Sequence, residues 1–160
     1  VKEEFGNKIK FVLDGGKCKV GIESTIISLV KKPEILRLGG LENSKIKKVL
    51  NKPIIININP NKKNTPGQSK LHYSPGIPLR MNALKSIKGE AYIALKKKNN
   101  KNKDFFYLSK NGNLSEAAKN LYSILRKVKK KGYKSIAIEK IINYGIGQSI
   151  NDRLNRASKK

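Results

Sequence analysis

The sequence has very few of the residues that build covalent links and metal sites. Its 160 residues include one cysteine, one histidine and no tryptophan. A single cysteine, Cys18, excludes an internal disulfide, so we expect a reducing, cytoplasmic environment. Cys18 also has no general base beside it in the sequence, and His72 has no nearby Cys, His or paired carboxylates. Neither a thiol nucleophile nor a zinc site is therefore predicted.

Long apolar runs are absent as well. No stretch is long enough to span a bilayer, and no charged-then-apolar signal opens the chain, so we expect no membrane contact. The hydrophobic content of 38% suffices for one ordinary core or two small ones. The chain begins at Val1 and its single methionine is Met81, from which we expect the true N-terminus to lie further upstream.

Acidic residues are scarce too. The 36 Lys and Arg face 11 Asp and Glu, a formal charge of +25, which is typical of proteins that bind polyanions. Most of the basic residues are Lys, accompanied by many Asn and Ile, and all three have A- and T-rich codons. A solvated surface set by genome composition is therefore the main interpretation. A nucleic-acid footprint and a general attraction for phosphate-bearing small molecules remain open.

The first part of the chain has the patterns of a small sheet. We expect strands at 11–13, 22–29, 34–37 and 53–58, and a helix at 43–50. The strands at 22–29 and 34–37 form a hairpin-like pair. This pairing brings Ser24 or Thr25 and Arg37 within reach of one pocket.

A polar linker at 59–64 follows, after which strands and helices alternate. We expect strands at 90–95, 105–108 and 135–139, and helices at 115–131 and 149–158. The first of these helices has an apolar stripe made of Ala118, Leu121, Tyr122, Leu125 and Val128. Leu114-Ser115 marks its start and Gly132 its end. This order predicts a small α/β sheet of the nucleotide-domain kind.

Prolines enclose the single histidine in the segment 65–75, TPGQSKLHYSP. Proline fixes its own φ and favours extended backbone before it, so a stiff segment presents His72 and Tyr73 at one place. The alternative is an interdomain linker whose His and Tyr merely pack on a neighbour.

Arg37 is one of five arginines in a chain that prefers lysine. A planar guanidinium suits a phosphate or carboxylate, although a surface salt bridge is the competing interpretation. Ser24 and Thr25 could donate to the same anion, or they are ordinary strand hydroxyls.

Several motifs resemble one known family. LDGG at 13–16, VGIESTII at 20–27 and ILRLG at 35–39 resemble the closing part of a YrdC-like domain. PGQSKLHYSP at 66–75 resembles the linker of the two-domain threonylcarbamoyl-AMP synthases, and GQSINDRL at 147–154 resembles the end of their small C-terminal domain. The matches follow the family's order and cover nearly the whole chain.

The resemblance implies an α/β fold in three parts. These are the end of a YrdC-like α/β sheet domain at 1–58, an extended linker or lid at 59–80, and a small Rossmann-like α/β domain at 81–160. The family's upstream Lys/Arg phosphate-binding motif and its Ser-x-Asn loop are not found, so we expect a C-terminal fragment that is inactive alone. Leu38 stands where the family commonly has proline.

The resemblance also implies a nucleotidyltransferase that condenses L-threonine, bicarbonate and ATP into threonylcarbamoyl-AMP and pyrophosphate. A partner complex then transfers the threonylcarbamoyl group to tRNA, so direct tRNA binding by this chain is not required. ATP is a substrate and Mg²⁺ accompanies it. No catalytic nucleophile and no metal ligand is assigned.

The family's ligand contacts carry over to three residues of this sequence. Ser24 would contact L-threonine, and Arg37 and His72 would contact ATP. Thr25 and Tyr73 are secondary candidates for the same walls. The alternative function is a basic RNA-binding or accessory module without catalysis.

Overall fold

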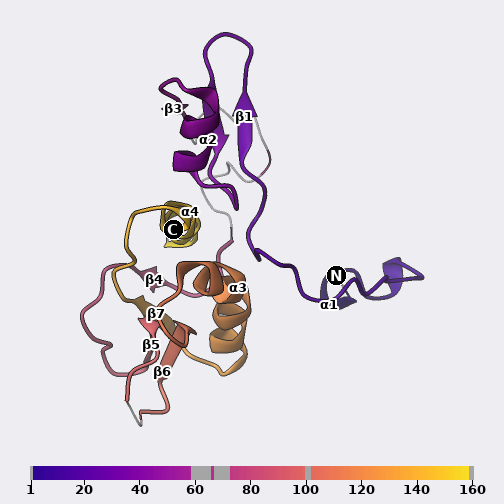
Figure 1. The fold of residues 1–160 in the computed structure, drawn as a ribbon. Helices are drawn as coiled ribbons and strands as arrows, with labels where there is room; N and C mark the ends of the chain where they lie inside the picture. The colour runs from indigo at the N-terminus through magenta and orange to yellow at the C-terminus, as the bar shows by residue number, and fades with distance from the viewer. Residues whose placement is uncertain (1, 59–65, 67–72, 100–101, 159–160) are drawn as a thin grey trace.

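The computed structural model describes residues 2–58, 66, 73–99 and 102–158, and in these the protein is an α/β structure with two sheets (Figure 1). The first sheet has the order β1-β2-β3, formed by Ile26–Ser28, Glu34–Arg37 and Ile55–Ile56. β1 runs antiparallel to β2, and β3 runs parallel to it. The predicted hairpin-like pair is thus confirmed, although both outer strands are shorter than expected.

Helix α2 (Asn43–Leu50) has the predicted bounds and covers this sheet. Ile46 is buried in one cluster with Ile35, Leu38 and Ile54. Val49, which helical spacing places beside Ile46, is 84% exposed. The apolar face of α2 is therefore only partly covered by the described residues.

The second sheet has the order β4-β7-β5-β6. Its strands are β4 (Leu79–Arg80), β5 (Glu90–Lys96), β6 (Phe105–Ser109) and β7 (Ser135–Ile138). All three pairings are parallel, which confirms the predicted small α/β sheet. β4 was not predicted because a strand of two residues leaves no alternating pattern to detect.

Helices α3 (Leu114–Lys130) and α4 (Ile146–Ser158) complete this unit. The stripe on α3 is buried as predicted, apart from Tyr122, which is partly buried. The helix is capped by the Asn113 side chain, one residue before the predicted start, and Gly132 follows its end with φ 80°. α4 lies between the four-stranded sheet and the β1–β2 hairpin (Figure 1).

The N-terminal segment differs from prediction. Helix α1 (Lys2–Phe5) and the 3-10 turn η1 (Gly6–Lys8) were not predicted, and they stand apart from both sheets (Figure 1). The predicted strand at 11–13 is wrong, since Phe11 is 86% and Leu13 98% exposed. A short apolar run forms no strand where no described segment pairs with it.

Among the described residues, no helix has the length and apolarity needed to cross a membrane. The proposed domain boundaries at 58 and 80 flank a linker that lies largely outside the described residues. This division of the chain therefore stays a prediction.

The cap of α3 can be tested by a single substitution. The Asn113 side chain accepts a hydrogen bond from the Glu116 amide at 2.9 Å. We expect Asn113→Ala to lower the free energy of unfolding by about 1 kcal/mol, measured by urea denaturation. Asn113→Asp keeps an acceptor and should stay close to the parent chain; equal losses in both variants would contradict the cap's role.

Candidate functional site

Ser24 and Arg37 meet at the start of the β1–β2 hairpin. Arg37 Nη2 donates to Ser24 Oγ at 3.0 Å, and Arg37 Nε donates to the Ser24 carbonyl at 3.0 Å. The remaining terminal nitrogen, Nη1, donates to the Pro66 carbonyl at 3.1 Å. Arg37 is 9% exposed, whereas Ser24 is exposed. The structure therefore brings together the two residues that the sequence placed at one pocket.

This pair has a definite chemical capacity. A serine hydroxyl that accepts a hydrogen bond from a guanidinium keeps its own proton available for another acceptor. The positive charge beside it favours an anionic acceptor, such as a carboxylate or a phosphate oxygen. The Ser24 hydroxyl can therefore donate to an anion while it accepts from Arg37.

Thr25 is differently engaged. Its Oγ1 donates to the Leu41 carbonyl at 2.7 Å and accepts from the Leu41 amide at 3.2 Å. These two bonds tie β1 to the loop before α2. The Thr25 hydroxyl thus makes both of these hydrogen bonds with main-chain atoms of Leu41. A contact between Thr25 and a ligand stays a prediction.

Gly39 allows the two strand ends to approach closely. A Cβ on Gly39 would lie 2.3 Å from the carbonyl carbon of Ser24 and 2.3 Å from the amide nitrogen of Thr25. The neighbouring Gly40 amide donates to the Glu23 carbonyl at 2.8 Å. The backbone that holds Ser24 is therefore packed directly on residues 39 and 40.

A cluster of aromatic and charged side chains adjoins this backbone. Tyr73 stacks on Tyr122 of α3 with ring centroids 5.4 Å apart, and the Arg153 guanidinium of α4 lies 5.1 Å from the Tyr73 ring centre. Arg153 Nε donates to Glu23 Oε2 at 2.9 Å. The Tyr122 hydroxyl also points to Glu23, at 3.3 and 3.4 Å from its two oxygens.

The cluster shifts the protonation of its members. Burial and the hydrogen bond to Glu23 raise the pKa of Tyr73 to about 12. Burial and the Glu23 charge raise the pKa of Tyr122 as well. Burial alone would raise the pKa of Glu23, but the charge and hydrogen bond of Arg153, with a backbone hydrogen bond, hold it below its usual value. At neutral pH the cluster therefore pairs an ionised Glu23 with Arg153 and two neutral phenols.

Sequence reasoning did not select Glu23, Tyr122 or Arg153 as site residues. Arg153 is one of the five arginines, the same signal that singled out Arg37. Tyr122 was assigned to the apolar stripe of its helix. His72, the remaining predicted contact, lies outside the described residues.

The carboxyl ends of the parallel strands are the usual ligand edge of such a sheet. Here this edge is occupied by the protein's own carboxylates. Glu139 accepts from the Leu95 amide at 2.9 Å and pairs with Lys98. Glu116 in the first turn of α3 accepts from the Ser109 hydroxyl at 2.6 Å. These two carboxylates add negative charge to this edge.

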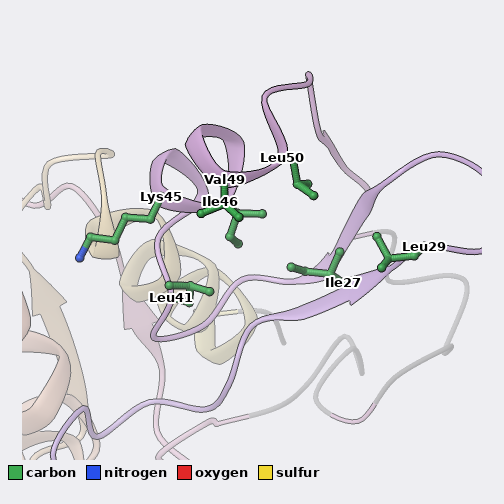
Figure 2. Close-up of a pocket in the computed structure, with 7 residues that line it drawn as sticks. All are labelled: Ile27, Leu29, Leu41, Lys45, Ile46, Val49 and Leu50. Atoms are coloured by element: carbon green, nitrogen blue, oxygen red, sulfur yellow. The ribbon is translucent and has the colours of Figure 1, made fainter.

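An apolar hollow of about 300 Å³ lies between α2 and β1, and Figure 2 shows the side chains around it. Its lining comprises Ile27, Leu29, Leu41, Lys45, Ile46, Val49 and Leu50. It contains neither Ser24 nor Arg37. Among the described residues, no group of three or more His, Cys, Asp or Glu side chains could hold a metal ion.

Two family models match the chain. "Threonylcarbamoyl-AMP synthase, C-terminal domain" matches residues 41–159, and "Telomere recombination" matches residues 1–39. The threonylcarbamoyl-AMP synthase of Pyrococcus abyssi is 30% identical over 180 residues, covering 99% of this chain and 52% of that protein. The synthase of Bacillus subtilis is 32% identical over 84 residues, covering 49% of this chain and 24% of that protein.

Two solved structures are similar as well. A crystal structure of Pyrococcus abyssi Sua5 complexed with L-threonine matches with a TM-score of 0.81 at 28% identity, covering 98% of this chain and 52% of that one. A variant of the same protein, with an adjacent His and Tyr both changed to Ala, matches with a TM-score of 0.71 at 26% identity, covering 98% and 49%. The chain thus spans about half the length of the Pyrococcus abyssi protein.

The contact at Gly39 makes a direct prediction. Gly39→Ala should lower the free energy of unfolding by about 1–3 kcal/mol, because the added methyl meets backbone that cannot move aside cheaply. The measurement is chemical denaturation. Gly15→Ala is the matched control, since a Cβ there meets nothing within 4 Å. Equal stability of the two variants would contradict the close packing.

The lowered pKa of Glu23 makes a prediction about acid stability. A carboxyl with a lowered folded pKa stabilises the fold above its unfolded pKa, and this contribution is lost as pH falls through the folded value. The difference in unfolding free energy between the parent chain and Glu23→Gln should therefore be largest near neutral pH. It should shrink as pH falls below about 4.5, in denaturation series at several pH values. A difference independent of pH would contradict the ion pair.

Proposed function

Because the chain belongs to the threonylcarbamoyl-AMP synthase family through the C-terminal domain at 41–159, we propose that it forms the C-terminal half of such an enzyme. The reaction is the condensation of L-threonine, bicarbonate and ATP into threonylcarbamoyl-AMP, with release of pyrophosphate. The single observation that carries this proposal is the Ser24–Arg37 pair, which combines an oriented hydroxyl with a cation.

Each predicted contact has a role in this reaction. Ser24 donates to the L-threonine carboxylate, and Arg37 contributes positive charge on the ATP side. His72 contacts the nucleotide, with Tyr73 beside it. The only adjacent His and Tyr in this chain are His72 and Tyr73. The Pyrococcus abyssi variant also changes an adjacent His and Tyr, which supports the choice of His72 and Tyr73 as contact residues.

The chemistry requires positioning more than covalent catalysis. The threonine amine attacks CO₂ and loses a proton, or attacks bicarbonate with loss of water, and either route gives a carbamate. A carbamate oxygen then attacks the α-phosphate, and the bond from the α-phosphorus to the pyrophosphate oxygen breaks. The protein must orient these reactants, offset the charge of the triphosphate and exclude water from labile intermediates. Arg37 provides charge at one point, and the Ser24 hydroxyl fixes the orientation of the amino acid.

Mg²⁺ would accompany ATP and offset part of the triphosphate charge. It would be held chiefly through the nucleotide, since the described residues contain no group of three or more His, Cys, Asp or Glu side chains that could hold a metal ion. The product then passes to a complex that transfers the threonylcarbamoyl group to tRNA. We place this reaction in the cytoplasm. The chain itself need not bind tRNA.

The role of Ser24 can be tested in the product of the whole reading frame that contains this chain. We expect Ser24→Ala to raise the KM for L-threonine at least about tenfold, because a hydrogen bond to a charged group is lost. The assay is threonine-dependent release of pyrophosphate from ATP. Ser123→Ala is the control, since this exposed hydroxyl on α3 bonds only the Asn120 carbonyl of its own helix. Absence of threonine-dependent release in the parent product would overturn the function.

The isolated 160-residue chain should release no pyrophosphate in a threonine-dependent manner. The chain spans about half the length of the Pyrococcus abyssi synthase, and the family's Lys/Arg phosphate-binding motif and Ser-x-Asn loop belong to the segment upstream of the part that it matches. Only some of the ligand contacts are therefore expected in the isolated chain. Release above a no-enzyme control, measured with purified chain, would refute this expectation.

A further inference from the structure

Arg153 uses all three nitrogens of its guanidinium on different partners. Nε donates to Glu23 Oε2 at 2.9 Å, Nη2 donates to the Leu38 carbonyl at 2.7 Å, and Nη1 donates to Asp152. The side chain is 1% exposed. Only the planar fork of arginine reaches three acceptors in this way, because lysine offers a single point of charge.

Two of these partners are the direct neighbours of predicted ligand residues. Glu23 precedes Ser24, and Leu38 follows Arg37. One guanidinium therefore bridges the two strand ends whose side chains form the Ser24–Arg37 pair. Its face also lies against Tyr73, where the described chain resumes after residue 72.

The C-terminal unit comprises the four-stranded sheet with α3 and α4. Other side chains of this unit also contact the backbone beside Ser24 and Arg37. The Ser149 hydroxyl, on the same helix as Arg153, donates to the Gly39 carbonyl at 2.8 Å. Tyr122 of α3 adds its contact to Glu23. Asp152 accepts from both Arg153 and Arg156, so Glu23 and Asp152 together balance the two arginines. α3 and α4 thus hold the site backbone through polar contacts of matched charge.

We propose that Arg153 is a positioning residue, which sets the Ser24 hydroxyl against the Arg37 guanidinium by bonding Glu23 and Leu38. This inference rests on the proposed function for its catalytic meaning. It also assigns the C-terminal unit a task. Through these contacts, α3 and α4 align the strand ends of the other sheet.

The first test uses amide hydrogen exchange in the 160-residue chain, followed by NMR. The Gly40 amide, which bonds the Glu23 carbonyl, reports on the site backbone. The Glu139 amide, which bonds the Ile93 carbonyl at 2.9 Å, reports on the four-stranded sheet. In Arg153→Lys we expect Gly40 to exchange at least about tenfold faster, with a much smaller change at Glu139.

The matched control is Arg156→Lys. Arg156 lies on the same helix, is 5% exposed and bonds the same Asp152 carboxylate, but within the described residues it bonds neither Glu23 nor Leu38. This variant should leave the ratio of Gly40 to Glu139 exchange unchanged. If the two amides accelerate equally in Arg153→Lys, or if both variants accelerate Gly40 alike, the positioning role is overturned.

The second test separates this proposal from the proposed function. In the product of the whole reading frame, Arg153→Lys should raise the KM for L-threonine about tenfold, while Arg156→Lys should not. An active parent with an unchanged KM in Arg153→Lys overturns the positioning role and leaves the function standing. An inactive parent overturns the function, and Gly40 exchange still decides whether Arg153 holds the strand ends.

If Arg153→Lys does not fold, Glu23→Gln and Ser149→Ala provide a replacement test. Each removes one contact to the same backbone and leaves Arg153 in place. Both should accelerate Gly40 exchange relative to Glu139. If neither does so, and Arg153→Lys does not fold, the proposal is wrong.

Discussion

A guanidinium that is removed from water must be surrounded by oxygen atoms, and the structure depends on how this need is met for Arg153. Unpaired burial of such a charge would cost several kcal/mol, so the folded chain has to bring acceptors to it. The acceptors come from segments far apart in the sequence: Glu23 before β1, Leu38 after β2 and Asp152 on α4. The hydrogen bonds that buried Arg153 requires therefore determine how α4 packs against the β1–β2 hairpin. Apolar contacts alone would allow this junction to slide, whereas directional bonds do not.

Local patterns in the sequence predicted the regular elements that bury an apolar face. α3 was found because its stripe repeats at helical spacing, and Leu121 and Val128 are fully buried as a result. β5, β6 and β7 were found because each is a compact apolar run between turn residues. The apolar pattern gave wrong strand predictions where strand formation depends on a pairing partner rather than on composition. Phe11 to Leu13 is apolar but has no described partner strand, while Leu79–Arg80 pairs with β7 without any apolar alternation of its own.

The candidate site was predicted in part, for reasons visible in single residues. Arg37 was distinctive as an arginine among lysines, and a hairpin pairing was enough to place it near Ser24. Arg153 had the same distinction, but its partners Glu23 and Leu38 are separated from it by more than a hundred residues. No short-range pattern indicates such a contact. The motif GQSINDRL at 147–154, which carries part of the family resemblance, contains Arg153. It does not indicate which residues Arg153 contacts. Thr25 was selected from its strand position, which did not indicate that its hydroxyl bonds the Leu41 backbone; its contact with a ligand stays a prediction.

The separation of Glu23 and Arg153 by 130 positions has a consequence during synthesis on the ribosome. At roughly 5–20 residues per second, the hairpin leaves the ribosome on the order of ten seconds before the helix that carries its arginine partner. During this interval Glu23 and Leu38 lack Arg153, and the ends of β1 and β2 are held by contacts within residues 23–41, such as the bonds from Arg37 to Ser24 and from Gly40 to Glu23. Completion of α4 ends this interval, so the maturation of the site is timed by translation.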